Sequence, residues 1–202
     1  MKSADVLGAV VVLLCVAPTC SAITNGGFEA GTFDGWSVDN VGFSFAEVAD
    51  WLGPPEGDYH GYMSAIDGGV ASLERVVSAT AGQRVQFDVY VLLYETPPEP
   101  EDPDRFSEAS MTAFALADGY TDALTIPDTS LQWTTVSLDP FPADGDYTIR
   151  FSATTTSVGN PGPSAEASMG LDEVRLVPEP CDLVLLGVGA IGLLAFGRWR
   201  RA

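Results

Sequence analysis

Cysteine and histidine are scarce in this chain, and the shortage excludes several kinds of site. The 202 residues contain three cysteines, at positions 15, 20 and 181, near the two ends. The long stretch between them therefore cannot form an intrachain disulfide. It holds one histidine, His60, which without cysteine is too few ligands for a zinc site. Serine–histidine catalysis would depend on that single imidazole, and no G-x-S-x-G motif occurs.

Positive charge is scarce as well. Residues 23–180 contain no lysine and five arginines (75, 84, 105, 150 and 175) against 26 acidic residues, a formal net charge of −21. Such a surface repels phosphate backbones, so we expect no nucleic-acid partner. It attracts divalent cations, although a solvated acidic surface accounts for the charge on its own.

The N-terminal residues have the pattern of a secretory signal peptide. Lys2 precedes a short apolar stretch, Val6–Ala17, and the small residues Thr19-Cys20-Ser21-Ala22 follow. This predicts a helical signal peptide over residues 1–22, with cleavage after Ala22. Two alternatives are a lipoprotein signal at Cys20, which the preceding Thr19 disfavours, and a transmembrane helix, which the short apolar stretch disfavours.

The C-terminal residues contain a second apolar segment. Leu183–Phe196 carries no charge and is followed by a basic cluster with Arg198, Arg200 and Arg201. It predicts a minimal transmembrane helix over about residues 182–198. Arginines after an apolar span favour a cytoplasmic C-terminus, which places the rest of the chain outside the membrane.

The whole tail, residues 177–202, resembles the PEP-CTERM sorting signal of exported bacterial proteins. The resemblance rests on three features in order: Val177-Pro178-Glu179-Pro180, the Leu- and Gly-rich span, and Arg198, Arg200 and Arg201. It implies that an exosortase recognises the tail at the inner membrane and cuts near the Pro-Glu-Pro. The chain would then pass from a membrane-anchored intermediate to the cell surface or the extracellular space. An ordinary C-terminal membrane anchor is the alternative.

Between the two ends, the pattern is that of an all-β protein. Gln83–Tyr94 alternates apolar and polar residues, which is typical of a strand with one wet face. We place this strand at the centre. Further short strands are expected at 62–66, 71–79, 110–117, 123–126, 133–138, 147–155 and 171–176, with a turn at Asp67-Gly68-Gly69. No internal repeat occurs, and the pattern predicts a single β-sandwich over residues 23–176.

The start of this region resembles galactose-binding-like jelly-roll domains, many of which are carbohydrate-binding modules. The residues concerned are Asn25-Gly26-Gly27-Phe28-Glu29 and a following Gly-x-x-x-Gly-Trp that ends at Trp36. The resemblance implies a structural Ca²⁺ held by Glu29 and Asp172. Asp172 shares the parity of Val174 and Leu176, so it should point inward and need a partner. The alternative is that Glu29 caps a turn and Asp172 pairs with Arg175 or Arg150.

Sugar-binding surfaces use exposed aromatic side chains, and the candidates are Trp51, Tyr59, Tyr62, Tyr90 and Tyr94, of which we select Trp51, Tyr90 and Tyr94. The alternative is that these rings belong to the core or to an ordinary amphipathic surface. We assign Trp133 to the core and His60 to a loop. The main hypothesis is a non-catalytic structural or adhesive protein of an exopolysaccharide-rich surface or biofilm, sorted by its tail. The alternative is a carbohydrate-binding module for an extracellular glycan, and a glycoside hydrolase is a distant third.

Overall fold

The computed structural model describes residues 21–98, 104–129, 131–159 and 163–178, and these residues form strands, turns and loops. The prediction of an all-β fold is therefore confirmed for this part of the chain. The compact unit extends over Cys20–Val177. Its strands are β1 (Ser21–Ala22), β2 (Ser37–Ala49), β3 (His60–Ala79), β4 (Gln83–Tyr94), β5 (Phe106–Ala117), β6 (Tyr120–Ile126), β7 (Thr134–Ser137), β8 (Gly145–Val158) and β9 (Glu166–Pro178).

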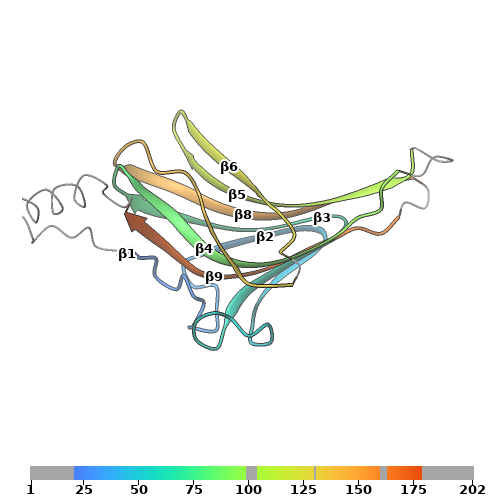
Figure 1. The fold of residues 1–202 in the computed structure, drawn as a ribbon, viewed down its shortest axis with the longest axis horizontal. Helices are drawn as coiled ribbons and strands as arrows, with labels where there is room; N and C mark the ends of the chain where they lie inside the picture. The colour runs from blue at the N-terminus through green and yellow to red at the C-terminus, as the bar shows by residue number, and fades with distance from the viewer. Residues whose placement is uncertain (1–20, 99–103, 130, 160–162, 179–202) are drawn as a thin grey trace, which may run out of the picture. The chain divides into compact units, whose positions relative to one another are not determined.

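The strands form one hydrogen-bonded path, β6-β5-β8-β3-β9-β4-β7, that folds over into two layers (Figure 1). The fold occurs at β3, because its two parts have different neighbours. Gly61–Ile66 pairs with β9, whereas Val70–Ala79 pairs with β8. β2 runs antiparallel to β3 along both parts, and β1 pairs with the end of β9. One layer thus contains β6, β5 and β8, and the other contains β9, β4 and β7.

β3 is a single bent strand, so the predicted chain reversal at Asp67-Gly68-Gly69 is wrong. Asp67 and Gly68 have positive φ angles of 47° and 91°, which bend the strand without reversing it. The bend is held from outside, because the Thr155 hydroxyl accepts hydrogen bonds from the Gly68 and Gly69 amides at 3.0 and 3.1 Å. The carboxylate of Asp67 also accepts one from the Ala165 amide at 2.9 Å.

The core lies between the two layers. Alternate residues of β4 are fully buried, namely Val85, Phe87, Val89 and Val91, and the strand has the predicted bounds. They face alternate residues of β8, and Phe87 meets Phe151 edge to face at 4.9 Å between ring centroids. Each such buried side chain stabilises the fold by about 1.5–3 kcal/mol.

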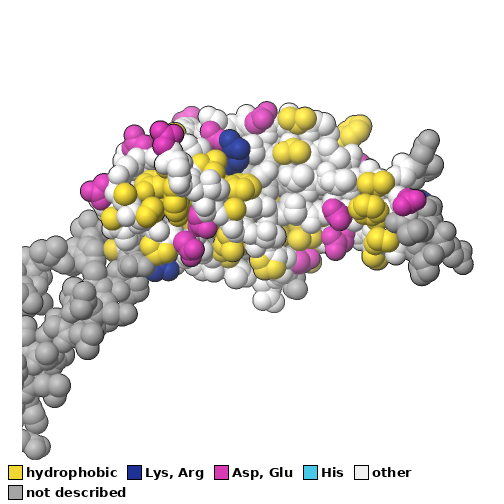
Figure 2. Space-filling model, turned by 90° about the horizontal axis from the view of Figure 1, so that it is seen from above, with side chains coloured by type: hydrophobic (Ala, Val, Ile, Leu, Met, Phe, Trp, Pro, Cys, Tyr) yellow, Lys and Arg dark blue, Asp and Glu magenta, His cyan; other side chains and the backbone are white. Residues whose placement is uncertain are grey.

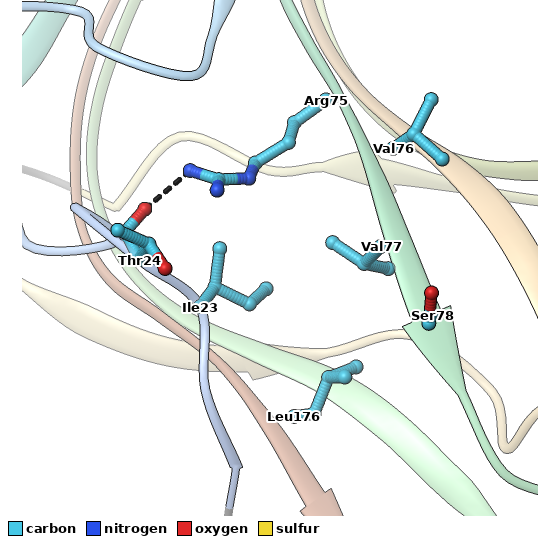
Figure 3. Close-up of a pocket in the computed structure, with 7 residues that line it drawn as sticks. All are labelled: Ile23, Thr24, Arg75, Val76, Val77, Ser78 and Leu176. Atoms are coloured by element: carbon cyan, nitrogen blue, oxygen red, sulfur yellow. Dashed lines mark hydrogen bonds between the residues drawn. The ribbon is translucent and has the colours of Figure 1, made fainter.

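The residues before β2 are anchored to the sandwich. Phe28 is fully buried, and Ile23 and Trp36 are nearly so. Arg75 of β3 donates a hydrogen bond to the carbonyl of Thr24, beside a small cavity of about 210 Å³ (Figure 3). The same guanidinium lies over the Trp36 ring, 5.8 Å from its centroid, a cation–π arrangement. The N-terminal loop is thereby fixed in place beside β9.

The ends of the domain differ slightly from the prediction. β1 consists of Ser21 and Ala22, the last two residues of the predicted signal peptide. β9 continues through Val177 and Pro178, so these first two residues of the sorting motif belong to the last strand. Glu179, Pro180 and the arginine cluster lie outside the described residues, as do residues 1–20. Within the described ranges no helix is long and apolar enough to cross a membrane, and the predicted span at 182–198 falls outside them.

Candidate functional site

The outer face of the layer that contains β2, the first part of β3, β9, β4 and β7 carries the candidate site. Strand register decides which side chains share this face. Tyr62 is opposite Glu47 of β2 on one side and Gly170 of β9 on the other. One step along, Ser64 is opposite Phe45 and Ser168. The core residues Met63 and Ala65 point the other way.

Six ring side chains lie in a continuous series across this face, and we call them the aromatic row. Phe45 and Tyr62 are 5.8 Å apart between centroids, and Tyr62 and Trp51 are 4.8 Å apart. Trp51 also meets His60 edge to face at 5.9 Å. His60 meets Trp133 at 5.6 Å, and Trp133 meets Tyr90 at 5.9 Å. The row therefore joins four segments: β2, the loop after it with the start of β3, the residue before β7, and β4. Its members are Phe45, Tyr62, Trp51, His60, Trp133 and Tyr90.

His60 is the first residue of β3 rather than a loop residue, and it is fully buried at the middle of the row. Neither ring nitrogen has a hydrogen-bond partner among the described residues. Burial lowers the pKa of the imidazole below its usual range, and the nearby Asp50 carboxylate opposes that shift. The imidazole is therefore neutral, and it is packed between the rings of Trp51 and Trp133.

Trp133 belongs to this outer face and not to the core, so its predicted assignment is wrong. It is half-buried, and its indole N–H donates to the carbonyl of Leu52 at 3.3 Å. The room for its ring comes from Gly170: a Cβ there would lie 3.0 Å from Trp133 and 2.9 Å from Leu52. Glycine at this strand position lets the indole lie close against β9.

The three predicted sugar-binding residues have different places. Trp51 is 55% exposed and Tyr90 is half-buried, and the row brings them together through His60 and Trp133. Tyr94, at the end of β4, is 57% exposed but has no described ring contact with the row. Sequence reasoning missed Phe45, His60 and Trp133, because only strand register and the path of two loops place them beside Trp51.

Carboxylates border the row. Burial raises the pKa of the Tyr62 hydroxyl, and the carboxylates of Glu166 and Glu47 add to the rise, while hydrogen bonding to Ser168 opposes it. Glu166 itself accepts a hydrogen bond from the Ser168 hydroxyl at 2.6 Å. The Ser168 hydroxyl also lies 3.0 Å from that of Ser64. The face thus combines apolar rings with negative charge and hydroxyl groups.

The two predicted metal ligands meet at a second place, where the N-terminal loop and the loop before β3 lie side by side (Figure 1). The Glu29 carboxylate accepts hydrogen bonds from the amides of Asp58 and Tyr59 at 3.1–3.2 Å. The Asp172 carboxyl accepts one from the Glu56 amide at 3.3 Å and one from Glu173 at 2.8 Å. Both side chains approach Gly27, and a cavity of about 260 Å³ opens between the loops.

Asp172 is fully buried, as predicted, but the alternation that linked it to Val174 and Leu176 breaks at Glu173, which has a φ of 48°. Burial raises the pKa of its carboxyl to about 7; the Glu56 amide opposes the rise, and the carboxylates of Glu29, Asp88 and Glu56 add to it. The predicted alternative partners are wrong, because Arg150 pairs with Glu74 and Arg175 with Glu173 and Gln86. Glu29 does cap the loop, as the alternative held. The described residues contain no group of three or more acidic, histidine or cysteine side chains placed for a metal ion.

Comparisons with known proteins identify the fold through solved structures. No protein-family model matches the chain, and no curated protein matches it in sequence. Among solved structures, the chain is similar to TmCBM61 in complex with β-1,4-galactotriose: 17% identity, TM-score 0.59, covering 80% of this chain and all of that one. It is also similar to the enzymatically active domain of tailspike protein 4 of bacteriophage CBA120, at 12% identity and a TM-score of 0.53. That match covers 81% of this chain but 22% of the tailspike. The described part of the chain therefore has the jelly-roll β-sandwich fold found in carbohydrate-binding modules.

Proposed function

We propose that the domain is a non-catalytic carbohydrate-binding module that binds an extracellular glycan on the aromatic row. The observation that carries this proposal is the row itself, a line of ring side chains across one sheet face with Trp51 exposed near its middle. Sugar rings have apolar C–H faces that stack on such side chains, while their hydroxyls need acceptors and donors. Ser168, Tyr62 and the bordering carboxylates supply the polar groups.

The fold supports the same proposal. A structure with this fold holds β-1,4-galactotriose, and a sheet face lined by aromatic side chains is a surface to which an extended sugar chain can bind. A purely structural or adhesive role would need no such row, although a glycan-binding domain can serve adhesion to a polysaccharide matrix. We therefore propose glycan binding as the primary function, and adhesion to a polysaccharide matrix as a consequence of that binding.

The test is glycan binding by the full chain and two matched variants. Trp51→Ala should weaken binding more than about tenfold, because truncation of a central aromatic side chain in a binding surface typically costs 2 kcal/mol or more. Tyr94→Ala removes an equally exposed ring outside the row and should leave binding within about twofold. Equal losses in both variants, or unchanged binding by Trp51→Ala, would reject the row as the binding surface.

We also propose a structural Ca²⁺ clamp at Glu29 and Asp172. The fit is supported by the donor set, because two carboxylates and the carbonyls of the adjoining loops are the hard oxygen ligands that Ca²⁺ prefers. The raised pKa of Asp172 supports it too: burial is the main cause and the Glu29 carboxylate adds to it, and a bound divalent cation would favour the ionised form against both. The bound ion would connect the N-terminal loop to β9. The domain has no cysteine that could form a disulfide for the same purpose.

Thermal unfolding with Ca²⁺ and with chelator tests the clamp. Saturating Ca²⁺, at about 100 times its dissociation constant, should add about 2.7 kcal/mol to the free energy of unfolding. Glu29→Gln and Asp172→Asn should each remove that gain. Glu108→Gln, an exposed residue of β5 with the same change in charge, serves as the control and should retain it. A gain that persists in both site variants would place the ion elsewhere.

Finally, we propose that the chain is exported through residues 1–22 and sorted through residues 177–202 by an exosortase, which delivers the domain to the cell surface. The order of the Pro-Glu-Pro, apolar and arginine segments supports this proposal. Glycan binding and surface delivery then fit together, because the ligand and the domain would meet outside the cell.

A further inference from the structure

We propose that the aromatic row selects glycans that contain amino sugars with free ammonium groups, in preference to neutral and uronate-containing glycans. This inference rests on the proposed function and names the class of sugar bound at the same surface. The row is surrounded by negative charge, and none of its described contacts is with an arginine. Three carboxylates border the rings, and they come from three different segments.

The first two carboxylates belong to Glu47 and Glu166. Glu47 is the register partner of Tyr62 on β2, so its side chain lies on the same face. Glu166, on β9, is the register partner of Ile66 and shares that face with Ser168. Both carboxylates add to the rise in the pKa of the Tyr62 hydroxyl, as their register positions on this face lead one to expect. The third belongs to Asp50, which follows Ala49, the register partner of His60, and its carboxylate opposes the fall in the pKa of the imidazole.

Three arginines of the domain make their described contacts with groups outside the row. Arg75 is bound to the Thr24 carbonyl, Arg150 to Glu74, and Arg175 to Gln86 and Glu173. Arg84 is on β4, six residues from Tyr90, which is about 20 Å along an extended strand. Arg105 precedes β5 and forms no hydrogen bond or ion pair with the row among the described contacts. Figure 2 shows one face of the molecule, where magenta acidic side chains are more numerous than dark-blue basic ones, in keeping with the scarcity of arginine in the sequence.

Aromatic rings bordered by carboxylates bind cations well. An ammonium group is attracted by ring faces, and a carboxylate accepts its N–H donors. A uronate would instead bring a negative charge next to Glu47, Glu166 and Asp50. Against a domain with a net charge of −21, that repulsion also slows encounter, whereas a cationic glycan is drawn in. His60, neutral and fully buried at the middle of the row, adds no positive charge to this face.

The experiment compares oligomers of β-1,4-linked glucosamine with fully N-acetylated oligomers of equal length and with oligogalacturonate, using the full chain. We expect the glucosamine oligomer to bind about tenfold more tightly than the N-acetylated one, and the uronate to bind most weakly. In about 1 M NaCl, where charges are screened beyond about 3 Å, the preference should fall to about twofold or less.

Variants separate local charge from overall charge. Glu47→Gln combined with Glu166→Gln should weaken glucosamine binding about three- to tenfold and change N-acetylated binding less than twofold. Two substitutions of the same kind elsewhere, Glu74→Gln with Glu108→Gln, remove equal charge from other strands and should keep the preference. An equal loss in this control pair would overturn the inference.

The two proposals fail in different ways. Neutral or N-acetylated glycans that bind as tightly as the glucosamine oligomer, with binding lost in Trp51→Ala, would overturn the amino-sugar preference and leave glycan binding intact. No binding of any of the three oligomers, and none on a broad neutral glycan set, would overturn both.

Discussion

At the scale of single residues, Asp172 has surroundings that oppose its charge. Its carboxyl is fully buried, and other carboxylates lie near it, so the pKa rises from 3.8 to about 7. The folded state then holds the proton more tightly than the unfolded state. The resulting stability is fully present below about pH 4 and is lost as the pH rises towards 7. A shift of this size corresponds to at most about 4 kcal/mol.

We therefore expect the midpoint of thermal unfolding in chelator to fall as the pH rises from about 4 to about 7. The Asp172→Asn variant has no titrating group there, so its midpoint should change less across the same range. The difference between the two curves isolates Asp172 from the general repulsion of the acidic surface. Parallel curves for the two proteins would show that Asp172 is not the source of the pH dependence.

Sequence reasoning predicted that Asp172 is buried, but the alternation on which it relied does not hold in the structure. Parity with Val174 and Leu176 predicted that it points inward. In the structure the alternation breaks at Glu173, which has a φ of 48°, and both Leu171 and Asp172 are fully buried. A backbone irregularity of this kind leaves little mark in a single sequence. The predictions for His60 and Trp133 were wrong for a related reason. Each residue lies where a loop meets a strand, and the hydrophobic periodicity of a strand does not predict side-chain direction there.

At the scale of elements, the loop between β2 and β3 supports both candidate sites. It carries Trp51, which covers His60, and its amides at Asp58 and Tyr59 bind the Glu29 carboxylate. Gly57 is essential to that second contact, because a Cβ there would lie 2.2 Å from the carboxyl carbon of Glu29. A side chain at this position must therefore displace Glu29.

Gly53, in the same loop, supplies a matched control. Its φ of 61° is close to the 66° of Gly57, but a Cβ on Gly53 meets nothing within 4 Å. Both alanine variants should lose roughly 1 kcal/mol of stability to backbone strain, and Gly57→Ala should lose more and should also lose its response to Ca²⁺. Chemical denaturation of the two variants, with Ca²⁺ and with chelator, measures the difference. Equal stability and equal Ca²⁺ response would mean that Glu29 is free to move without consequence.

The strands could be predicted only in part from the sequence. The bounds of β4 were predicted to the residue because its alternation is long and regular. The strands after it were predicted too short, except β7, which was predicted too long. β3 was divided in two because Asp67-Gly68-Gly69 is a strong turn signal on its own. Hydrogen bonds from Thr155 and pairing with β2 across the bend hold it as one strand, and such long-range contacts cannot be inferred from a local pattern.

At the scale of the whole molecule, the sorting proposal requires that the β-sandwich remain complete after the tail is cut. If the tail is cut near Pro178-Glu179-Pro180, the released domain must keep all of β9. The strand ends at Pro178, and its buried residues Val174 and Leu176 precede the motif. Cleavage beyond Pro178 therefore leaves the sandwich complete, whereas cleavage upstream would remove part of its core.

Expression in a host with a matching exosortase tests this. The mature protein should leave the membrane fraction, and mass spectrometry should place its C-terminus at or beyond Pro178. Replacement of Pro178-Glu179-Pro180 by alanines should keep the uncut chain in the membrane fraction, while Pro142→Ala, at an exposed proline in the loop before β8, should be processed normally. Release of the triple-alanine protein would reject the motif. Retention of both proteins uncut would indicate an ordinary membrane anchor, with the glycan-binding domain held permanently at the outer side of the membrane.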